Sequence, residues 1–487
     1  MGAALSTTNF ESYIDKLFKA SGYPGLSITV RSSSGIIFSK GFGKRSIEHD
    51  LPVLPDTVFG IASMSKSMTT FALAILEAEG RFSFDDPVIK YFPDFCVPGI
   101  PPECVTCRHL AMHTSGIPPI QPLEWSIAMN SNERDNEWSR RMRAESPNRM
   151  DRIEQIVEYI SEGNYGIENY STLGSPGEYM SYSNEGYALL SYIFDIAAGE
   201  TLEAFLKRRV FAPLGMDRTV LDLDGSEARE IAKGNITSLF ERNDNGVLVW
   251  DNDFSVLPPF RGCACVKSTS EDMTKYYTML SSKGVWNGKQ VFPERAVDIL
   301  VGKGFPLRKI PFYCLGLRKR LIKDQVVCEH YGGLHGTSTG GAFIEGGYSV
   351  TVLCNEGGVE VDPFLWAGYN LVLGLPLETE HHMFDTLDSP AVFSAPHAIT
   401  GDYVSAEGIP AHCIVTYENG ELKSDYQGEL CRLTYCGESR FVADSVKTGK
   451  RVTHMEFYIR SNTAWGVLCG SRVYQRNRSD SEKEQLK

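Results

Sequence analysis

Segments that favour β-strands lie at two widely separated places, with a mainly helical region between them. Residues 26–43 hold two apolar runs around a Ser-Gly turn, and residues 325–355 hold three more. From about residue 80 to 260, apolar residues recur at helical spacing, and helices are also predicted over residues 10–19 and 64–79. Strands from both ends of a domain can pair in one sheet, whose apolar faces are then buried by packed helices. The pattern predicts an α+β domain with an antiparallel sheet flanked by helices, plus a helical region.

The character of the chain changes after this first domain, which we place at residues 1–378. Residues 379–398 contain prolines and little periodicity, which indicates a linker. Residues 399–477 alternate short β-type runs with turn signals about every ten residues, which predicts a small antiparallel β-barrel. Residues 478–487 form a polar tail.

Charge and hydropathy limit the partners of the chain. Its 487 residues carry 61 acidic and 48 basic side chains, for a formal net charge of -13. Such a surface repels nucleic acid and anionic membranes. No run of about 18 apolar residues is present, so we expect no membrane span. The N-terminal residues lack the basic and apolar regions of a secretory signal, although Gly2 and Ser6 fit the short myristoylation pattern.

The twelve cysteines are scattered, which favours reduced thiols in a cytoplasm over a disulfide framework. Cys104 and Cys107 form a C-x-x-C pair, and His109 and His113 follow closely. A zinc finger needs a loop of about a dozen residues between its two ligand pairs. We therefore expect no metal here, and place these residues on a short helix that faces a core.

The segment 60–80, "GIASMSKSMTTFALAILEAEG", carries the only S-x-x-K of the chain, Ser63 and Lys66. Residues three apart on a helix share a face, so the two side chains can touch. A serine hydroxyl is a weak nucleophile until a base takes its proton. A lysine serves as that base as a neutral amine, the form that burial favours. The same spacing also suits a helix-capping serine beside a lysine whose stem lies on apolar surface.

Two further motifs make the catalytic interpretation stronger. Tyr182 and Asn184 lie in a loop just before a predicted helix, where a tyrosine can relay a proton and an asparagine can hold a substrate amide. His330 and Gly332 belong to the only H-x-G of the chain, on a predicted strand. A strand that contains glycines lets a substrate backbone lie along its edge.

The set S-x-x-K, Y-x-N and H-x-G resembles the serine β-lactamase and penicillin-binding-protein superfamily. The form is that of class C β-lactamases, D-alanyl-D-alanine carboxypeptidases and D-aminopeptidase-like hydrolases. Further blocks, among them "YPGLSITV", "GRFSFDDPVIKYFPDF", "SPGEYMSYSNEGY" and "VFAPLGMDRT", occur in the family's order. The resemblance covers about residues 8–375 and is specific for the family more than for a substrate. The C-terminal module resembles the lipocalin-like barrels that follow some of these domains.

The resemblance implies roles for particular residues. Ser63 would attack a carbonyl, with Lys66 and Tyr182 sharing the proton transfers, while Asn184 and His330 orient the substrate. The backbone N–H groups of Ser63 and Gly333 would form the oxyanion hole beside Gly332. No cofactor or metal is implied, and the substrate would be a small molecule or a short peptide. The oligomeric state is not set by the sequence.

The chain also contains other copies of the family's motifs and a second histidine near the predicted strand. Tyr417 and Asn419 form a second Y-x-N, and residues 447–449 read K-T-G, but both lie in the C-terminal module. His335 is a second histidine near the predicted strand, at the site entrance or in a loop cap. His330 is preferred because glycines follow it at the family's spacing.

The predicted function is that of a serine hydrolase that forms an acyl-enzyme through Ser63. Histidine in place of the lysine of K-T-G is consistent with a D-aminopeptidase, amidase or esterase acting on small peptides or amino-acid derivatives. One alternative is an acyltransferase or peptide cyclase that uses the same acyl-enzyme. Another is a non-catalytic binding or scaffold protein on the same fold.

Overall fold

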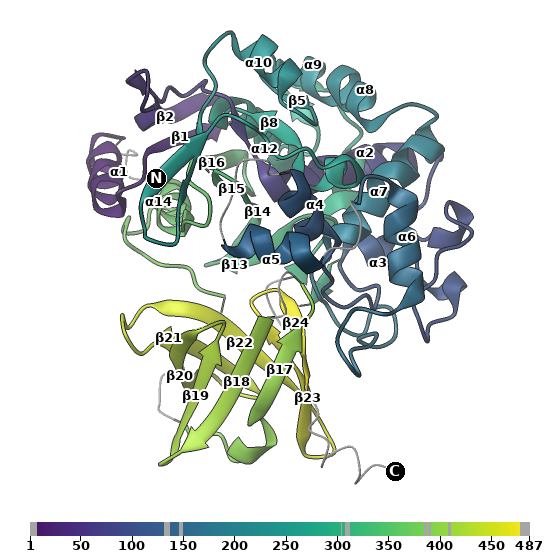
Figure 1. The fold of residues 1–487 in the computed structure, drawn as a ribbon. Helices are drawn as coiled ribbons and strands as arrows, with labels where there is room; N and C mark the ends of the chain where they lie inside the picture. The colour runs from purple at the N-terminus through teal and green to yellow at the C-terminus, as the bar shows by residue number, and fades with distance from the viewer. Residues whose placement is uncertain are drawn as a thin grey trace.

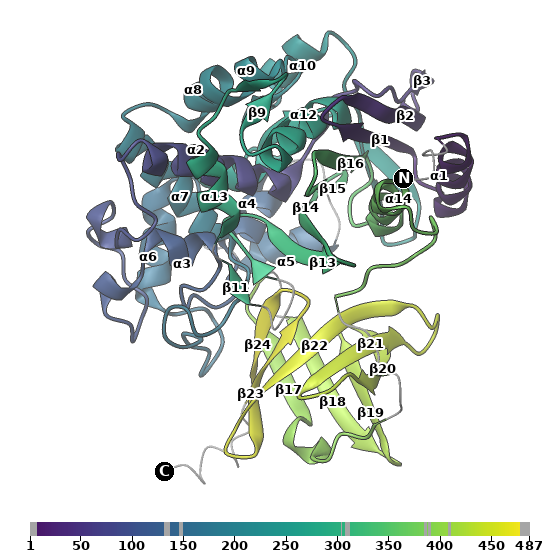
Figure 2. The ribbon, with the colours of Figure 1, turned by 180° about the vertical axis from the view of Figure 1, so that it is seen from behind.

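The computed structural model describes residues 7–130, 137–145, 150–302, 304–306, 312–383, 387, 391–407 and 411–477. A large domain of mixed helices and strands lies above a smaller β-barrel, and helix α14 (Asp362–Leu373) is the last helix of the large domain before the barrel (Figures 1 and 2). The C-terminal tail and Gly2, named above, lie outside the described residues.

The centre of the large domain is a nine-stranded antiparallel sheet in the order β11-β12-β13-β14-β15-β16-β1-β2-β3. Its strands are β1 (Gly25–Ser32), β2 (Gly35–Ser46), β3 (Leu51–Pro52), β11 (Phe305–Pro306), β12 (Phe312–Tyr313), β13 (Arg318–Ile322), β14 (Gln325–Leu334), β15 (Thr337–Ile344) and β16 (Tyr348–Cys354). The N-terminal strand β1 pairs with β16, with Leu26 opposite Cys354. The predicted closure of one sheet by both ends of the domain is confirmed.

The alternation of side chains along β1 explains how the sheet is covered. Leu26, Ile28 and Val30 point into an apolar cluster with the helices α1 (Thr7–Ser21) and α14. Ser27 and Thr29 point to the other face, where both hydroxyls hydrogen-bond to Ser270 at 2.8 Å. Ser270 begins helix α12, so small polar side chains let this helix lie close to the sheet.

The α-helices of the large domain are α1 (Thr7–Ser21), α2 (Ser65–Ala78), α3 (Cys107–Ala111), α4 (Pro122–Asn130), α5 (Glu137–Glu145), α6 (Ile153–Glu162), α7 (Asn184–Ala198), α8 (Leu202–Leu206), α9 (Ala212–Leu214), α10 (Ser226–Ala232), α11 (Arg261–Ala264), α12 (Ser270–Ser281), α13 (Glu294–Gly302) and α14 (Asp362–Leu373). Gly163 and Gly199 end α6 and α7 in the left-handed conformation, as their sequences predict. Several short strands outside the central sheet were not predicted: β4 (Phe59–Gly60), β5 (Val220–Leu221), β6 (Leu239–Arg242), β7 (Leu248–Asp251), β8 (Val266–Ser268), β9 (Val285–Trp286) and β10 (Lys289–Gln290).

The C-terminal module is a closed eight-stranded antiparallel barrel, which confirms the predicted architecture. Its strands are β17 (Gly401–Ser405), β18 (Ala411–Glu418), β19 (Glu421–Tyr426), β20 (Glu429–Tyr435), β21 (Arg440–Ser445), β22 (Arg451–Arg460), β23 (Thr463–Cys469) and β24 (Arg472–Arg476). Large buried side chains fill its interior, among them Tyr403, Phe441 and Phe457. The domain boundaries at residues 378 and 399 stay a prediction.

The barrel packs on the large domain through the hairpin of β23 and β24. Leu468 and Val473 share an apolar cluster with Leu173, Met180 and Tyr182 of the large domain. Backbone groups lock this contact, because Tyr182 N donates to Ser471 O at 2.8 Å and Val473 N donates to Ser181 Oγ at 3.1 Å. The barrel is thus fixed at the loop that carries a predicted catalytic residue.

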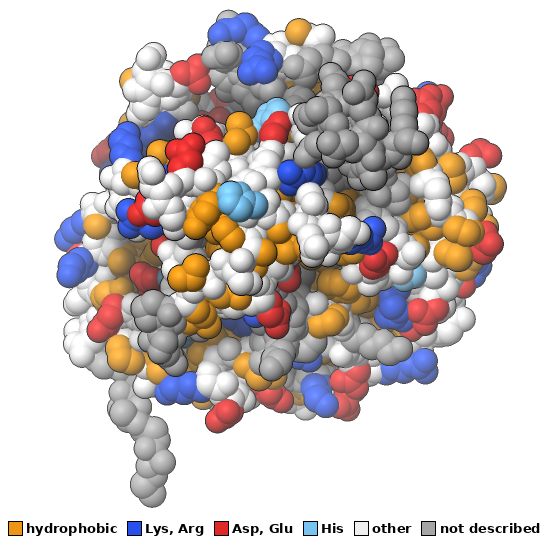
Figure 3. All heavy atoms as spheres, turned by 90° about the horizontal axis from the view of Figure 1, so that it is seen from below, with side chains coloured by type: hydrophobic (Ala, Val, Ile, Leu, Met, Phe, Trp, Pro, Cys, Tyr) orange, Lys and Arg blue, Asp and Glu red, His pale blue; other side chains and the backbone are white. Residues whose placement is uncertain are grey.

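Figure 3 shows the molecule from the side of the barrel, where acidic and basic side chains are interspersed with apolar ones. Among the described residues, no helix is both long enough and apolar enough to cross a bilayer.

Candidate active site

Ser63 lies in a strained turn that exposes it at the start of a buried helix. A 3-10 turn, Ala62–Met64, precedes α2, so Ser63 stands one turn before the α-helix in which Lys66 lies. Ala62 has φ of 45°, in the left-handed region that a residue with a side chain rarely adopts. From Ile61 to Leu76, Ser63 is the one residue that is not buried. The turn therefore presents a single hydroxyl from an otherwise enclosed segment.

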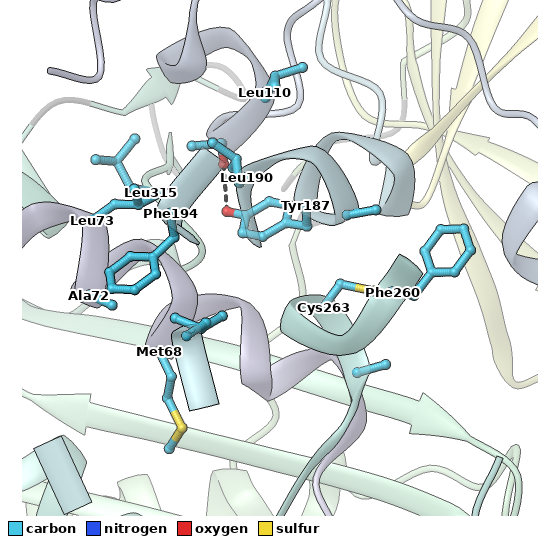
Figure 4. Packing of buried hydrophobic residues seen from close by; sticks show 14 of the residues in the cluster. Met68, Ala72, Leu73, Leu110, Tyr187, Leu190, Phe194, Phe260, Cys263 and Leu315 are labelled. Atoms are coloured by element: carbon cyan, nitrogen blue, oxygen red, sulfur yellow. Dashed lines mark hydrogen bonds between the residues drawn. The ribbon is translucent and has the colours of Figure 1, made fainter. Parts of the chain in front are cut away.

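Lys66 is fully buried beside that hydroxyl. Its Nζ lies 3.0 Å from Ser63 Oγ, 2.9 Å from Asn184 Oδ1 and 3.2 Å from the carbonyl oxygen of Cys263. The rest of α2 is packed against α7 through Met68, Ala72 and Leu73 on one side and Tyr187, Leu190 and Phe194 on the other (Figure 4). This core fixes the lysine stem and excludes water around the amine.

Tyr182 and Asn184 come from the segment that enters α7. The Ser183 side chain caps α7 by accepting from Gly186 N at 3.2 Å, which fixes the residues on each side of it. The ring of Tyr182 then lies beside Lys66, whose Nζ is over the ring at 4.8 Å from its centre. Asn184, the first residue of the helix, turns its amide oxygen to the same nitrogen. Three predicted residues thus meet around Lys66.

A chain of buried hydrogen bonds runs from this segment to His330 on β14. Ser183 N donates to His113 Nδ1 at 3.0 Å, so His113 Nε2 carries the proton and donates to the Tyr313 hydroxyl at 3.0 Å. Tyr313 donates in turn to His330 Nε2 at 3.0 Å, and His330 Nδ1 donates to Tyr331 O at 2.5 Å. Every hydrogen bond in this series therefore has a defined donor and a defined acceptor.

Both imidazoles in this chain are held neutral. Burial, followed by the positive charges of Lys66 and Arg318, lowers the pKa of His330 to about 3. Burial, followed by Lys66 and His330, lowers the pKa of His113 well below its usual value. His330 therefore lies in the cavity wall as an uncharged ring, with both nitrogens bonded to protein groups.

Gly332 allows β14 to approach the serine turn. A Cβ at this position would collide with the carbonyl oxygen of Ile61 and come within 3.1 Å of Ala62 Cβ. Gly333 is exposed beside it and faces open space. The strand β13 pairs with β14 only as far as Glu329, so residues 330–334 extend beyond it along the cavity.

These residues line a cavity of about 570 Å³ between the two domains. Ser63, Tyr182, Asn184, His330, Gly332 and Gly333, all predicted from the sequence, are in its wall, and Lys66 lies behind Ser63. Leu123, Glu124 and Ile127 of α4 contribute another side. The barrel contributes Glu407, Ser471 and Arg472.

The chain matches the beta-lactamase family over residues 10–373. It belongs to that family. Penicillin-binding protein 4* of Bacillus subtilis (strain 168) is 31% identical over 193 residues, which are 39% of this chain and 37% of that protein. The match thus spans less than two fifths of this curated relative.

Solved structures of similar fold agree with the family. An octameric penicillin-binding protein homologue from Pyrococcus abyssi has a TM-score of 0.64 at 22% identity, over 96% of this chain and 99% of that one. This likeness therefore includes the barrel. A D-stereospecific amidohydrolase from Streptomyces sp. has a TM-score of 0.55 at 22% identity, over 73% of this chain and 95% of that one.

Other residues singled out in the sequence of this beta-lactamase-family chain lie as follows. His335 lines the cavity, with Nδ1 2.6 Å from Glu241 Oε1 and Nε2 2.8 Å from Asp251 Oδ2. Tyr417 lies near the end of β18, beside a hairpin of the barrel. Residues 447–449 lie in the turn between β21 and β22. His109 accepts from Thr106 N and thereby caps α3.

No group of three or more His, Cys, Asp or Glu side chains within the described ranges is placed to hold a metal ion.

Four residues of the site, His113, Tyr313, Arg472 and Glu407, have no predicted role. His113 was assigned to a core, and it is buried, but its role in the chain to His330 depends on Tyr313, a residue 200 positions away. Arg472 and Glu407 come from the barrel, which carries none of the family's motifs. A sequence signal exists only for His113, which lies in the family-like block "VTCRHLAMHTSGI".

Proposed function

We propose that this chain is a serine hydrolase that forms a covalent acyl-enzyme through Ser63. The observation that carries the proposal is the 3.0 Å separation of Lys66 Nζ and Ser63 Oγ, with the lysine fully buried and the serine open to a cavity. A lysine nitrogen at this distance is placed to take the hydroxyl proton. Family membership supports the same assignment.

The steps follow from the positions of these groups. Lys66 takes the proton of Ser63 as Oγ attacks the substrate carbonyl carbon. The backbone N–H groups of Ser63 and Gly333 receive the negative charge on the carbonyl oxygen. Lys66 and Tyr182 return a proton to the leaving group as its bond to carbon breaks. Water then attacks the ester, the same groups remove its proton, and Ser63 Oγ is released with a proton.

The substrate class we propose is a small peptide or amino-acid derivative with an amide or ester bond, in the manner of a D-aminopeptidase, amidase or esterase. A cavity of about 570 Å³ suits a molecule of that size. The likeness to a D-stereospecific amidohydrolase supports the D configuration. His330 is neutral, so the positive charges that line the cavity are those of Arg318 and Arg472.

An acyltransferase or peptide cyclase is a second candidate, because it needs the same acyl-enzyme and only a different acceptor. The open cavity between the domains, with walls from both, would admit an amine as well as water. A non-catalytic binding protein is a third, and the complete set Ser63, Lys66, Tyr182 and Asn184 at short distances speaks against it.

We further propose a cytoplasmic location. All twelve cysteines are free thiols, which suits a reducing compartment. The excess of acidic side chains speaks against nucleic acid as a partner.

The test is the intact mass of the protein after mixing with a fluorophosphonate, a penicillin, and D- and L-amino-acid amides and esters. We expect a mass gain in the wild type that is absent in Ser63→Ala, and turnover of at least one amide or ester. Competition between water and an added amine then separates hydrolysis from acyl transfer. A folded wild-type protein that gives no adduct with the fluorophosphonate would refute the acyl-enzyme.

A further inference from the structure

Arg472, the first residue of β24, carries a positive charge from the barrel into the cavity. Its guanidinium carbon lies 4.4 Å from the centre of the Tyr182 ring. A cation within about 6 Å of an aromatic ring is attracted to it, and more strongly when both are removed from water. The barrel thus contacts the side chain to which the proposed function assigns proton transfer.

The guanidinium is fixed in this place. Its Nε and one terminal nitrogen donate to the two carboxylate oxygens of Glu407, at 2.6 and 2.7 Å, and the other terminal nitrogen donates to Ser471 Oγ at 2.9 Å. The backbone oxygen of Ser471 accepts from Tyr182 N at 2.8 Å. The segment that holds the arginine is therefore hydrogen-bonded to the tyrosine itself.

Strand β14, which carries the H-x-G motif, supplies no positive charge at that motif. His330 lies 6.1 Å from Tyr182, ring centre to ring centre, and is neutral because it is buried and near Lys66. His113, whose ring centre is 4.2 Å from that of Tyr182, is neutral for the same reasons. Of the groups with a recorded ring contact to Tyr182, Lys66 and Arg472 are the cations.

We propose that Arg472 is a positioning residue of the active site, which holds the Tyr182 ring and stabilises negative charge on its oxygen during proton transfer. The inference rests on the proposed function. Without the barrel, the cation in contact with the Tyr182 ring would be Lys66. In the proposed reaction Lys66 must itself lose and gain a proton. Arg472 keeps its charge throughout, because guanidinium groups do not deprotonate in proteins. The barrel therefore completes the catalytic centre in addition to bounding the cavity.

The first test compares rates of fluorophosphonate labelling of Ser63 in intact, full-length variants. Arg472→Gln should label at least tenfold more slowly than the wild type. Arg472→Lys, which keeps the charge, should recover most of that loss. Arg476→Gln, on the same strand and against Tyr403 inside the barrel, is the matched control and should label at the wild-type rate.

The second test does not depend on catalysis. The ultraviolet difference spectrum between a protein and its Tyr182→Phe variant, followed against pH, reports the ionisation of this one phenol. In the Arg472→Gln background the phenol should ionise at a higher pH than in the wild-type background, and Arg472→Lys should restore the wild-type curve.

The outcomes are distinguishable. Unchanged labelling and an unchanged phenol titration in folded Arg472→Gln would overturn the proposed role of Arg472. Arg472→Lys as slow as Arg472→Gln would also overturn it, because shape and not charge would then matter. A wild-type protein that fails to label refutes the proposed function, while the phenol titration still decides whether Arg472 acts on Tyr182.

Discussion

Lys66 Nζ donates to Asn184 Oδ1 at 2.9 Å, closer than it lies to the serine it is proposed to activate. Asn184 is therefore held by the lysine as well as available to a substrate. An opposite charge within about 4 Å favours the protonated form of an amine. The neutral amide of Asn184 orients Lys66 without adding that charge.

Asn184→Asp should consequently slow the labelling of Ser63 at pH 7.5 by about tenfold or more, because the new carboxylate keeps Lys66 protonated. The labelling rate is measured by intact mass over time. Asn164→Asp, at an exposed loop position, adds the same charge elsewhere and should leave the rate unchanged. A labelling rate for Asn184→Asp equal to that of the wild type would argue that Lys66 is not the base.

Tyr313→Phe removes the hydroxyl that joins His113 and His330 and leaves a ring nitrogen of each without this partner. An unsatisfied buried polar group costs about 1–3 kcal/mol, so the free energy of unfolding should fall by about that amount for each nitrogen. Tyr165→Phe removes one hydrogen bond, to the carbonyl oxygen of Ile160, and should cost less. Urea unfolding of both variants gives the comparison, and equal losses would contradict the two-ended role of Tyr313.

His330 makes stability depend on acid pH. Its pKa is lowered to about 3 in the folded protein, chiefly by burial, while an unfolded histidine has a pKa of about 6.5. The unfolded chain therefore binds a proton that the folded protein does not. The stabilisation is complete above about pH 6.5 and is lost as the pH falls towards 3.

At pH 5.5 this one group should cost about 1.4 kcal/mol relative to pH 7.5. The variant His330→Gln should therefore lose less stability over this interval than the wild type, as measured by urea unfolding at both pH values. His49→Gln, whose side chain is 67% exposed, should follow the wild type. The opposite sign, with the wild type stabilised by acid relative to His330→Gln, would exclude a neutral buried ring.

Adjacent glycines on β14 allow a matched pair of substitutions. Gly332→Ala places a methyl group against the backbone of Ile61 and beside Ala62, and should displace the Ser63 turn. We expect a lower melting temperature and labelling at least tenfold slower. Gly333→Ala meets nothing within 4 Å and should keep the wild-type melting temperature. Equal melting temperatures for both variants would show that β14 can move away from the turn.

The family and most of the catalytic domain could be predicted because local motifs carried the information. Ser63 and Lys66 are three residues apart, and Tyr182 and Asn184 are two apart, so each pair is recognisable in one short window. The two-ended sheet was predicted because β1, β14, β15 and β16 are buried, β-rich runs. The ends of helices α6 and α7 could be predicted because Gly163 and Gly199 adopt the left-handed backbone conformation that ends a helix.

The remaining parts of the site depend on long-range contacts that leave no local pattern. Tyr313 reaches His113 and His330 only because β12 lies at one side of the sheet. Arg472 and Glu407 belong to one barrel but reach the cavity through the docking of a hairpin. The short strands β4, β5 and β8 were missed because two or three residues cannot establish a period.

The pairing of β1 with β16 limits when the sheet can form during synthesis of the chain. Leu26 meets its partner Cys354 only after more than 300 further residues have been made, and Arg472 follows Ser63 by 409 residues. At about 5–20 residues per second, roughly 20–80 s separate the synthesis of Ser63 from that of Arg472, the last residue that lines the cavity. A ribosome-bound chain thus carries Ser63 without an assembled site, and reactivity arrives only as the final strand is released.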